Sequence, residues 1–345
     1  MRLRQGGPLT FPDPRRYDHE GLVAVGGDLT LSANDPGAST RNAAAAVTVG
    51  AALDVGGALT LNNNGGTGAH AIQANLSAGT VSFVGNVTRS AGSTTWTLSG
   101  DSTVGSDIGG AVPFTKAGAG TLVLAGTLTA TTVTIDGGTL QAGNGSTTGT
   151  ISNSGALTIN AAGTLAINRS GNVTVADAVA TSATIAGNGT FRKAGGAGTL
   201  TIGGTMSGIS AVEIAPASGS LVLGNDDNDR IGSTAAVTVG TGSVFDIGNN
   251  VVGIGSLSLG GSLALSAPGA LTAASLTLTD GGNVNVPVAV TGTITAASGA
   301  SQISSTTTGA TVQVNDTATL TVGNAAAFAN TAAVTVASGG TDRKS

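Results

Sequence analysis

The sequence predicts an all-β fold, a right-handed parallel β-helix (β-solenoid) built from short strands. Of its 345 residues, 9% are charged and 2% aromatic, while 57 are glycine. The apolar residues are mainly Val, Ile, Leu and Ala, alternating with Thr, Ser and Asn, which is typical of strands with one buried face. These runs are short, and Gly, Asn or Asp separates them. Such punctuation indicates turns between many strands.

Repetition along the chain is the second observation. The string Phe-x-Lys-Ala-Gly opens at Phe114 and again at Phe191, and short Thr/Leu/Val runs follow over 114–143 and 191–224. Such a unit cannot bury its own apolar face and must stack on its neighbours. We therefore expect coils of about 20 residues. Glycine is expected at the corners because positive φ costs it little.

Other architectures fit the chain less well. No apolar stripe has helical spacing, and each interior glycine would cost a helix about 1 kcal/mol. A sandwich needs large inward side chains to fill a core about 10 Å thick, whereas small aliphatic residues suit stacked coils. We expect an irregular N-terminal segment over 1–21, a β-solenoid over 22–340 and a frayed end over 341–345.

Composition and charge weigh against several functions. The chain has no cysteine, which excludes disulfides and thiolate metal sites. Its net charge is −5, and its 13 Lys and Arg residues form no run after the N-terminus, which disfavours nucleic-acid binding. No apolar stretch approaches the roughly 18 residues of a membrane-spanning helix.

No residue is assigned a catalytic, cofactor-binding or metal-binding role, and we expect no enzyme activity. The two histidines, His19 and His70, lie in unlike surroundings and are interpreted as surface or turn residues. None of the three lysines, Lys116, Lys193 and Lys344, follows the Gly-x-x-x-x-Gly of a phosphate-binding loop.

The densest polar cluster is "GNDDNDRIG" at 224–232. Its carboxylates, Asp226, Asp227 and Asp229, are of the ligand type that Ca²⁺ prefers. The Gly-Gly-x-Gly-x-Asp spacing of calcium-binding β-rolls is absent, however. We interpret the cluster as a solvated loop and expect no specific calcium site.

A carbohydrate-active β-helix enzyme is the alternative function. It needs carboxylates gathered on neighbouring coils, whereas the 18 Asp and Glu residues are scattered. Trp96 and Tyr17 alone cannot form an aromatic sugar platform. Thr-x-Thr strings at 127–131, 277–279 and 317–321 are similar to ice-binding ladders, but Thr is common at exposed strand positions.

The first repeat contains three linked motifs. Lys-x-Gly-x-Gly-Thr-Leu spans Lys116–Leu122, Gly-Gly-Thr-Leu-Gln spans Gly137–Gln141, and Gly-Asn-Gly spans Gly143–Gly145. In this order they resemble the passenger-associated transport repeat of bacterial autotransporters, also called the autotransporter-associated β-strand repeat. The resemblance is best over 114–260, where the second copy departs by an inserted Gly196.

This resemblance implies a β-helical passenger that is exported to the cell surface or secreted, with the repeat assisting transport and folding. It implies no catalytic residues and no cofactor, and it implies an outer-membrane translocator barrel as partner. The chain opens on no recognisable signal sequence and closes on no barrel pattern, so we expect a fragment. The predicted function is a structural, surface-exposed stalk or passenger, with adhesion to an unidentified target as a further role.

The N-terminus carries a separate resemblance. Phe-Pro-x-Pro and the string Gly21–Leu29, within residues 8–30, resemble the start of leucyl/phenylalanyl-tRNA–protein transferase, a cytoplasmic enzyme. The Arg-Gly-Ile-Phe-Pro-Trp segment of that family does not follow, and so short a segment cannot form an aminoacyl-tRNA pocket. We expect a join near residue 30 and no transferase activity. The same residues also fit the inward positions of a first coil: Val23, Val25, Leu29 and Leu31.

Overall fold

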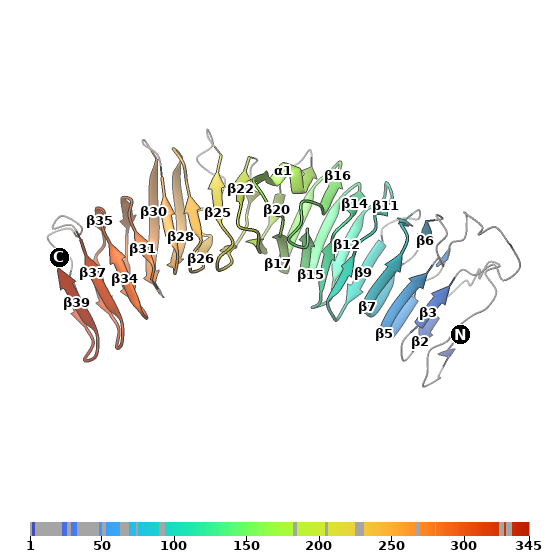
Figure 1. The fold of residues 1–345 in the computed structure, drawn as a ribbon, viewed down its shortest axis with the longest axis horizontal. Coiled ribbons are helices and arrows are strands. Elements are labelled where there is room, and N and C mark those ends of the chain that lie inside the picture. Colours follow the sequence, from blue (N-terminus) through green and yellow to red (C-terminus); the bar gives the residue numbers. More distant parts are fainter. Residues whose placement is uncertain are drawn as a thin grey trace, which may run out of the picture. The chain divides into compact units, whose positions relative to one another are not determined.

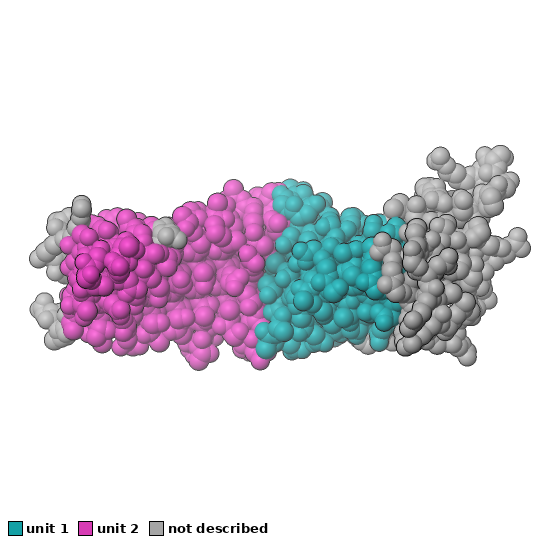
Figure 2. All heavy atoms as spheres, turned by 90° about the horizontal axis from the view of Figure 1, so that it is seen from below, with its two compact units in different colours: residues 1–166, 177–183 teal, residues 167–176, 184–345 magenta. Residues whose placement is uncertain are grey.

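The protein is known from a computed structural model that describes residues 2–3, 23–25, 29–32, 48–49, 53–62, 69–73, 75–89, 94–181, 185–203, 206–224, 231–265, 269–279, 281–323, 328 and 333–344. Within these residues the secondary structure is parallel β apart from one helical turn, α1 (Val175–Ala178). The predicted β-solenoid is thereby confirmed. Figure 1 shows the strands in the order of the sequence, and Figure 2 shows the two compact units into which the chain divides, residues 1–166 with 177–183 and residues 167–176 with 184–345.

The strands that begin in the first unit are β1 (Arg2–Leu3), β2 (Val23–Val25), β3 (Leu29–Ser32), β4 (Thr48–Val49), β5 (Leu53–Asn62), β6 (His70–Ile72), β7 (Leu76–Val84), β8 (Val87–Arg89), β9 (Thr94–Leu98), β10 (Ser102–Val104), β11 (Ile108–Gly109), β12 (Phe114–Ala117), β13 (Thr121–Leu124), β14 (Thr127–Ala130), β15 (Val133–Ala142), β16 (Thr150–Asn153), β17 (Leu157–Ile167) and β19 (Val179–Thr181).

The strands of the second unit are β18 (Val173–Thr174), β20 (Ile185–Gly187), β21 (Thr190–Lys193), β22 (Thr199–Ile202), β23 (Met206–Ser207), β24 (Ala211–Ile214), β25 (Ser220–Leu223), β26 (Ala236–Val239), β27 (Val244–Asp246), β28 (Val251–Leu259), β29 (Ser262–Ala264), β30 (Ala270–Leu278), β31 (Asn283–Val284), β32 (Val288–Val290), β33 (Thr293–Ala296), β34 (Ala300–Ile303), β35 (Thr307–Thr308), β36 (Thr311–Val314), β37 (Thr319–Val322), β38 (Ala333–Val336) and β39 (Thr341–Lys344).

In the first unit each coil contributes strands to three faces. β12 pairs with β9 and with the start of β15, β13 pairs with β10 and with the end of β15, and β14 pairs with β11 and β16. The pairing of Trp96 with Lys116 gives the step between coils, which the hydrogen bond from Thr121 to Asp101 also spans at 20 residues. This matches the coil length that the sequence predicts.

At the N-terminal end, β2 and β3 pair with β5, so the segment Val23–Ser32 contributes strands to the solenoid. Leu29 is buried, as a first coil requires. Of residues 1–21, expected to be irregular, only the two residues of β1 are described, and β1 pairs with β2.

In the second unit one face is a sheet with the strand order β18-β22-β25-β27-β29-β31-β34-β37-β39. Residues 341–344, expected to be frayed, form β39 and pair in parallel with β37. The backbone N–H and C=O groups along the edge of β37 need hydrogen-bond partners, and β39 supplies them by pairing with Thr319–Val322.

Small aliphatic side chains form the core by stacking coil upon coil. In β24, β26, β28 and β30 the inward position is held by Val212, Val237, Leu257 and Leu276, which pair in register and are buried. Strict alternation places each of these side chains inside, because successive residues of a strand point to opposite faces. Aliphatic side chains at equivalent positions of neighbouring coils therefore bury one another's surface.

Glycine is required where the backbones of successive coils approach most closely. A Cβ added to Gly120 would lie 2.1 Å from the carbonyl oxygen of Gly100, and one added to Gly138 would lie 2.4 Å from that of Gly120. Real Cβ atoms do not come so near to backbone oxygen. This column of glycines marks the corner between the faces formed by β12 and β13.

Outward Asn and Asp side chains join neighbouring coils at the corners of the first unit. The Oδ1 atom of Asp101 accepts a hydrogen bond from the backbone N–H of Thr121 at 2.7 Å. This bond holds the pKa of the Asp101 carboxyl below its ordinary value, because it stabilises the charged form. The same arrangement recurs in the pairs Asn75 with Thr95, Asn86 with Asp107, and Asp107 with Thr127.

Corners also absorb differences in coil length. Ala125 and Gly126 alone connect β13 to β14, whereas residues 143–149 connect β15 to β16 in the next coil. The flanking residues nevertheless stay in register, since Leu124 pairs with Ala142 and Thr127 pairs with Thr150. The longer connection, the 143–149 loop, is therefore added to the corner without shifting either face.

Candidate functional site: the buried polar corners of the repeats

The lysine of the first repeat points into the solenoid. Alternation along β12 places Phe114 and Lys116 inward, and Lys116 has no exposed surface. Its Nζ donates hydrogen bonds to the carbonyl oxygens of Ala117 at 2.8 Å, Gly118 at 3.0 Å and Gly137 at 3.3 Å. Gly118 has φ of 77°, which turns the chain at this corner. Lys116 thus links the corner of its own coil to that of the next.

The lysine of the second repeat has the same position. In β21, Phe191 and Lys193 point inward, and the Nζ of Lys193 donates to the carbonyl oxygens of Gly195 at 3.0 Å and Gly196 at 2.9 Å. The inserted Gly196 has φ of 76° and so adopts the conformation that Gly118 has in the first copy. The corner accommodates the extra residue, and the contact of the lysine with corner carbonyls is kept.

Burial changes the acidity of both ammonium groups. Loss of hydration lowers the pKa of Lys116 and of Lys193 from 10.5 to about 8. At Lys116 the Asp101 carboxylate acts in the opposite direction and raises the pKa. Three acceptors surround the Lys116 Nζ, which matches the three N–H groups of the protonated form.

We expect the stability of the protein to rise as the pH is raised from about 8 to about 10.5. In that range the unfolded chain binds more protons at these two lysines than the folded chain does, so the slope of the unfolding free energy against pH is positive. Below pH 8 the cost of burying the charge is fully present. The change is of order 3 kcal/mol per lysine.

Denaturant unfolding at the two ends of this range checks the effect. Comparison with Lys116→Met isolates the part due to one lysine, because the variant lacks that titration. A stability difference between the two proteins that is constant across the range would contradict the assignment.

A buried arginine binds further backbone carbonyls of the first unit. Arg89, which is 1% exposed, donates hydrogen bonds to the carbonyl oxygens of Pro113, Gly110 and Thr129, and its guanidinium carbon lies 5.1 Å from the ring centroid of Phe114. Burial lowers its pKa to about 10. Trp96 packs edge-to-face between Phe83 and Phe114, so the three rings form a column across successive coils.

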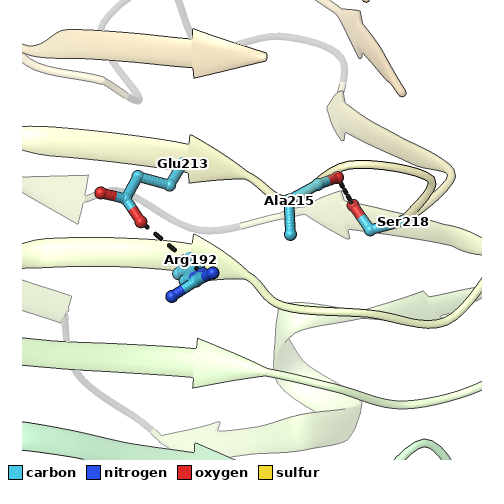
Figure 3. Close-up of polar contacts among 4 residues, drawn as sticks. All are labelled: Arg192, Glu213, Ala215 and Ser218. Atoms are coloured by element: carbon cyan, nitrogen blue, oxygen red, sulfur yellow. Dashed lines mark hydrogen bonds and ion pairs between the residues drawn. The ribbon is translucent and has the colours of Figure 1, made fainter. Parts of the chain in front are cut away.

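At other corners of the second unit, neutral side chains bind the carbonyls from inside. The hydroxyls of Ser218 and Ser243, which belong to neighbouring coils, both donate to the carbonyl oxygen of Ala215, at 2.5 Å and 2.7 Å (the bond from Ser218 is drawn in Figure 3). The side-chain amide of Asn250 donates to the carbonyl oxygens of Ile247 at 2.7 Å and Gly224 at 3.1 Å. These inward side chains of the two units therefore share one task, the binding of carbonyls where the chain turns.

The outward side of the same strands is different. Arg192, next to Lys193, points out and forms an ion pair with Glu213 at 3.6 Å, with both side chains nearly half exposed (Figure 3). Such a pair adds little stability. Further along this face, the outward positions that flank Leu257, Leu276 and Ile294 carry hydroxyl side chains: Ser256, Ser258, Ser275, Thr277, Thr293 and Thr295.

The structure corrects one expectation about the candidate residues. His70, interpreted from the sequence as a surface or turn residue, is fully buried in β6. The reason is alternation, since His70 and Ile72 share the inward side of this strand. His19, Tyr17 and the aspartates of the 224–232 cluster (Asp226, Asp227 and Asp229) lie outside the described residues.

Comparison with known proteins gives no relative. No family model, curated protein or solved structure matches the chain. The described residues contain no group of three or more His, Asp or Glu side chains placed to hold a metal ion. Among the described helical residues, none belongs to a segment long and apolar enough to span a membrane.

Proposed function

We propose that the chain is a structural segment of an autotransporter-like passenger or stalk, exported and exposed at the cell surface, in which the Phe-x-Lys-Ala-Gly repeats fasten coils during folding. The observation that carries this proposal is the use of the repeat lysines. Lys116 and Lys193 point inward and bind corner carbonyls, and Lys116 reaches the Gly137 carbonyl of the following coil. A lysine placed in this way has a structural role, because it stabilises the corners at which the coils turn.

The register of the coils supports a structural role. Each coil contacts its neighbours through paired strands and stacked aliphatic side chains, so stability is the sum of many contacts between nearest neighbours. A protein of this kind can fold from one end as successive coils emerge, which suits export as an extended chain. The outward rows of Ser and Thr hydroxyls would supply the surface for adhesion.

Surface display tests the proposal. The chain is placed between a secretion signal and an outer-membrane translocator barrel in a Gram-negative host, and exposure is measured by protease shaving of intact cells. We expect the wild-type chain to be displayed and the double variant Lys116→Met, Lys193→Met to be displayed several-fold less, because its coils close poorly.

Arg192→Met provides the matched control, since it removes an outward cation from the same strand as Lys193. We expect its display to equal that of the wild type. A wild-type chain that stays inside cells in which the barrel itself inserts would refute export, and equal display of the double variant would refute the role of the lysines.

A further inference from the structure

The 143–149 loop combines an asparagine and a glycine in an unusually open setting. Residues 144–148 are all exposed, and Gly145 has φ of 91°. The Oδ1 of Asn144 accepts hydrogen bonds from the hydroxyl of Ser146 at 2.7 Å and from its backbone N–H at 3.3 Å. Within this fully described loop, the backbone N–H of Gly145 donates no hydrogen bond. No described residue of the next coil forms a backbone hydrogen bond with this peptide group.

These features favour an intramolecular reaction. The backbone nitrogen of Gly145, on losing its proton to solvent base, can attack the side-chain carbon Cγ of Asn144. The new C–N bond closes a five-membered succinimide ring, and the bond from Cγ to Nδ2 breaks as ammonia leaves. Water then opens the ring at either carbonyl, giving aspartate or isoaspartate without any change of oxidation state.

The local chemistry supports each step. Glycine presents no Cβ to obstruct the attacking nitrogen. The hydrogen bonds from Ser146 to the Asn144 Oδ1 stabilise the negative charge that develops on this oxygen during the attack. We propose that Asn144 is a site of spontaneous modification, at which the side-chain amide is converted through a succinimide to aspartate and isoaspartate.

A second Asn-Gly pair in the chain provides an internal comparison. The carbonyl oxygen of Asn188 accepts a hydrogen bond from the Ser210 hydroxyl at 2.7 Å, and that of Gly189 accepts one from the Ser210 backbone N–H at 3.1 Å. Gly189 is also buried. The next coil thus holds the peptide groups on both sides of Gly189, so the rotation that ring closure requires is opposed. The third pair, Asn64-Gly65, lies outside the described residues.

The corner asparagines are tied to the neighbouring coil, which opposes the side-chain rotation that ring closure requires. The Oδ1 atoms of Asn75, Asn86 and Asn172 accept hydrogen bonds from backbone N–H groups of the neighbouring coil. Each is followed by a branched residue, Leu or Val, which hinders attack by the following nitrogen. Asn144 therefore differs from them both in its following residue and in its freedom from the coil stack.

The modification would change the surface and leave the fold intact. The 143–149 loop has no charged residue, and each converted chain gains one negative charge beyond its net −5. The pairs on either side of the loop, Leu124 with Ala142 and Thr127 with Thr150, lie in the strands and remain in place. Conversion thus places a carboxylate, or a longer isoaspartyl backbone, at one exposed corner.

Peptide mapping by mass spectrometry tests the proposal on the purified full chain. The native protein is held at mildly alkaline pH, and conversion is followed at Asn144 and Asn188, with a parallel sample in denaturant. We expect Asn144 to convert at least about tenfold faster than Asn188 in the native chain, a difference of about 1.4 kcal/mol in activation free energy. In denaturant the two rates should become comparable, because both residues precede glycine.

The variant Asn144→Gln supplies the second measurement. Its longer side chain would have to close a six-membered ring, so the acidic form seen by ion exchange in the wild type should be absent. Native conversion of Asn144 that is no faster than that of Asn188 would overturn the proposal. Persistence of the same acidic form in Asn144→Gln would also overturn it, since the charge would then arise elsewhere.

Discussion

Replacement of Gly120 by alanine should destabilise the first unit by about 3 kcal/mol or more, the upper range for added volume in a packed site. The new Cβ would lie 2.1 Å from the Gly100 carbonyl oxygen and 2.8 Å from the Gly100 nitrogen. These atoms belong to the backbone of the neighbouring coil, which cannot move aside as a flexible side chain could. To relieve the overlap, the two coils would have to separate at this corner.

Denaturant unfolding followed by circular dichroism measures this effect, and Gly105→Ala is its matched control. A Cβ at Gly105 would meet no atom within 4 Å, and Gly105 does not have positive φ. We expect the control to change the unfolding free energy by less than about 0.5 kcal/mol. Equal stability of the two variants would show that the coils are not as close at Gly120 as described.

Replacement of Lys116 by methionine should destabilise the protein by about 2–4 kcal/mol, because buried carbonyls lose their donor. Methionine fills a similar volume, so the loss is mainly one of hydrogen bonds to Ala117, Gly118 and Gly137. The destabilisation should increase as the pH passes from about 8 to 10.5, since the stability of the wild type rises in that range and the variant lacks this gain.

Arg192→Met is the control for this variant in the same unfolding experiment. It removes a cation that is nearly half exposed and whose contact is one surface ion pair with Glu213. Its effect should therefore fall within about 1 kcal/mol. If Arg192→Met destabilised the chain as much as Lys116→Met, burial of the lysine would not explain its contribution.

The fold could be predicted from the sequence because the information for a solenoid is local. Alternation in strings such as Leu257-Ser258-Leu259 identifies the buried face, and glycines at regular intervals identify corners. Because the pattern recurs and one repeat cannot bury its own apolar face, the repeats must stack on one another, whatever the conformation of each turn. The step of 20 residues in the first unit is a consequence of this regularity.

The buried polar corners could not be predicted in the same way. Lysine is seldom fully buried, so the sequence alone does not predict an inward position for Lys116 and Lys193. A signal was nevertheless present, because each lies two residues after an inward phenylalanine and so shares its face. His70 carries the same signal through Ile72. The carbonyls that the two lysines bind lie beyond the strand, at the corner of the same coil and, for Lys116, also at the corner of the next coil. The sequence of one strand therefore does not reveal them.

The ability of corners to lengthen while the faces stay in register has an evolutionary consequence. The 143–149 loop stands where the preceding coil has only Ala125 and Gly126, yet the strands on both sides pair as before. Insertions and deletions at such a corner are therefore close to neutral for the scaffold, and new sequence can be tried there without redesign of the core. Variation among descendants of this protein should collect at corners, and the same positions are suited to grafting foreign peptides for display.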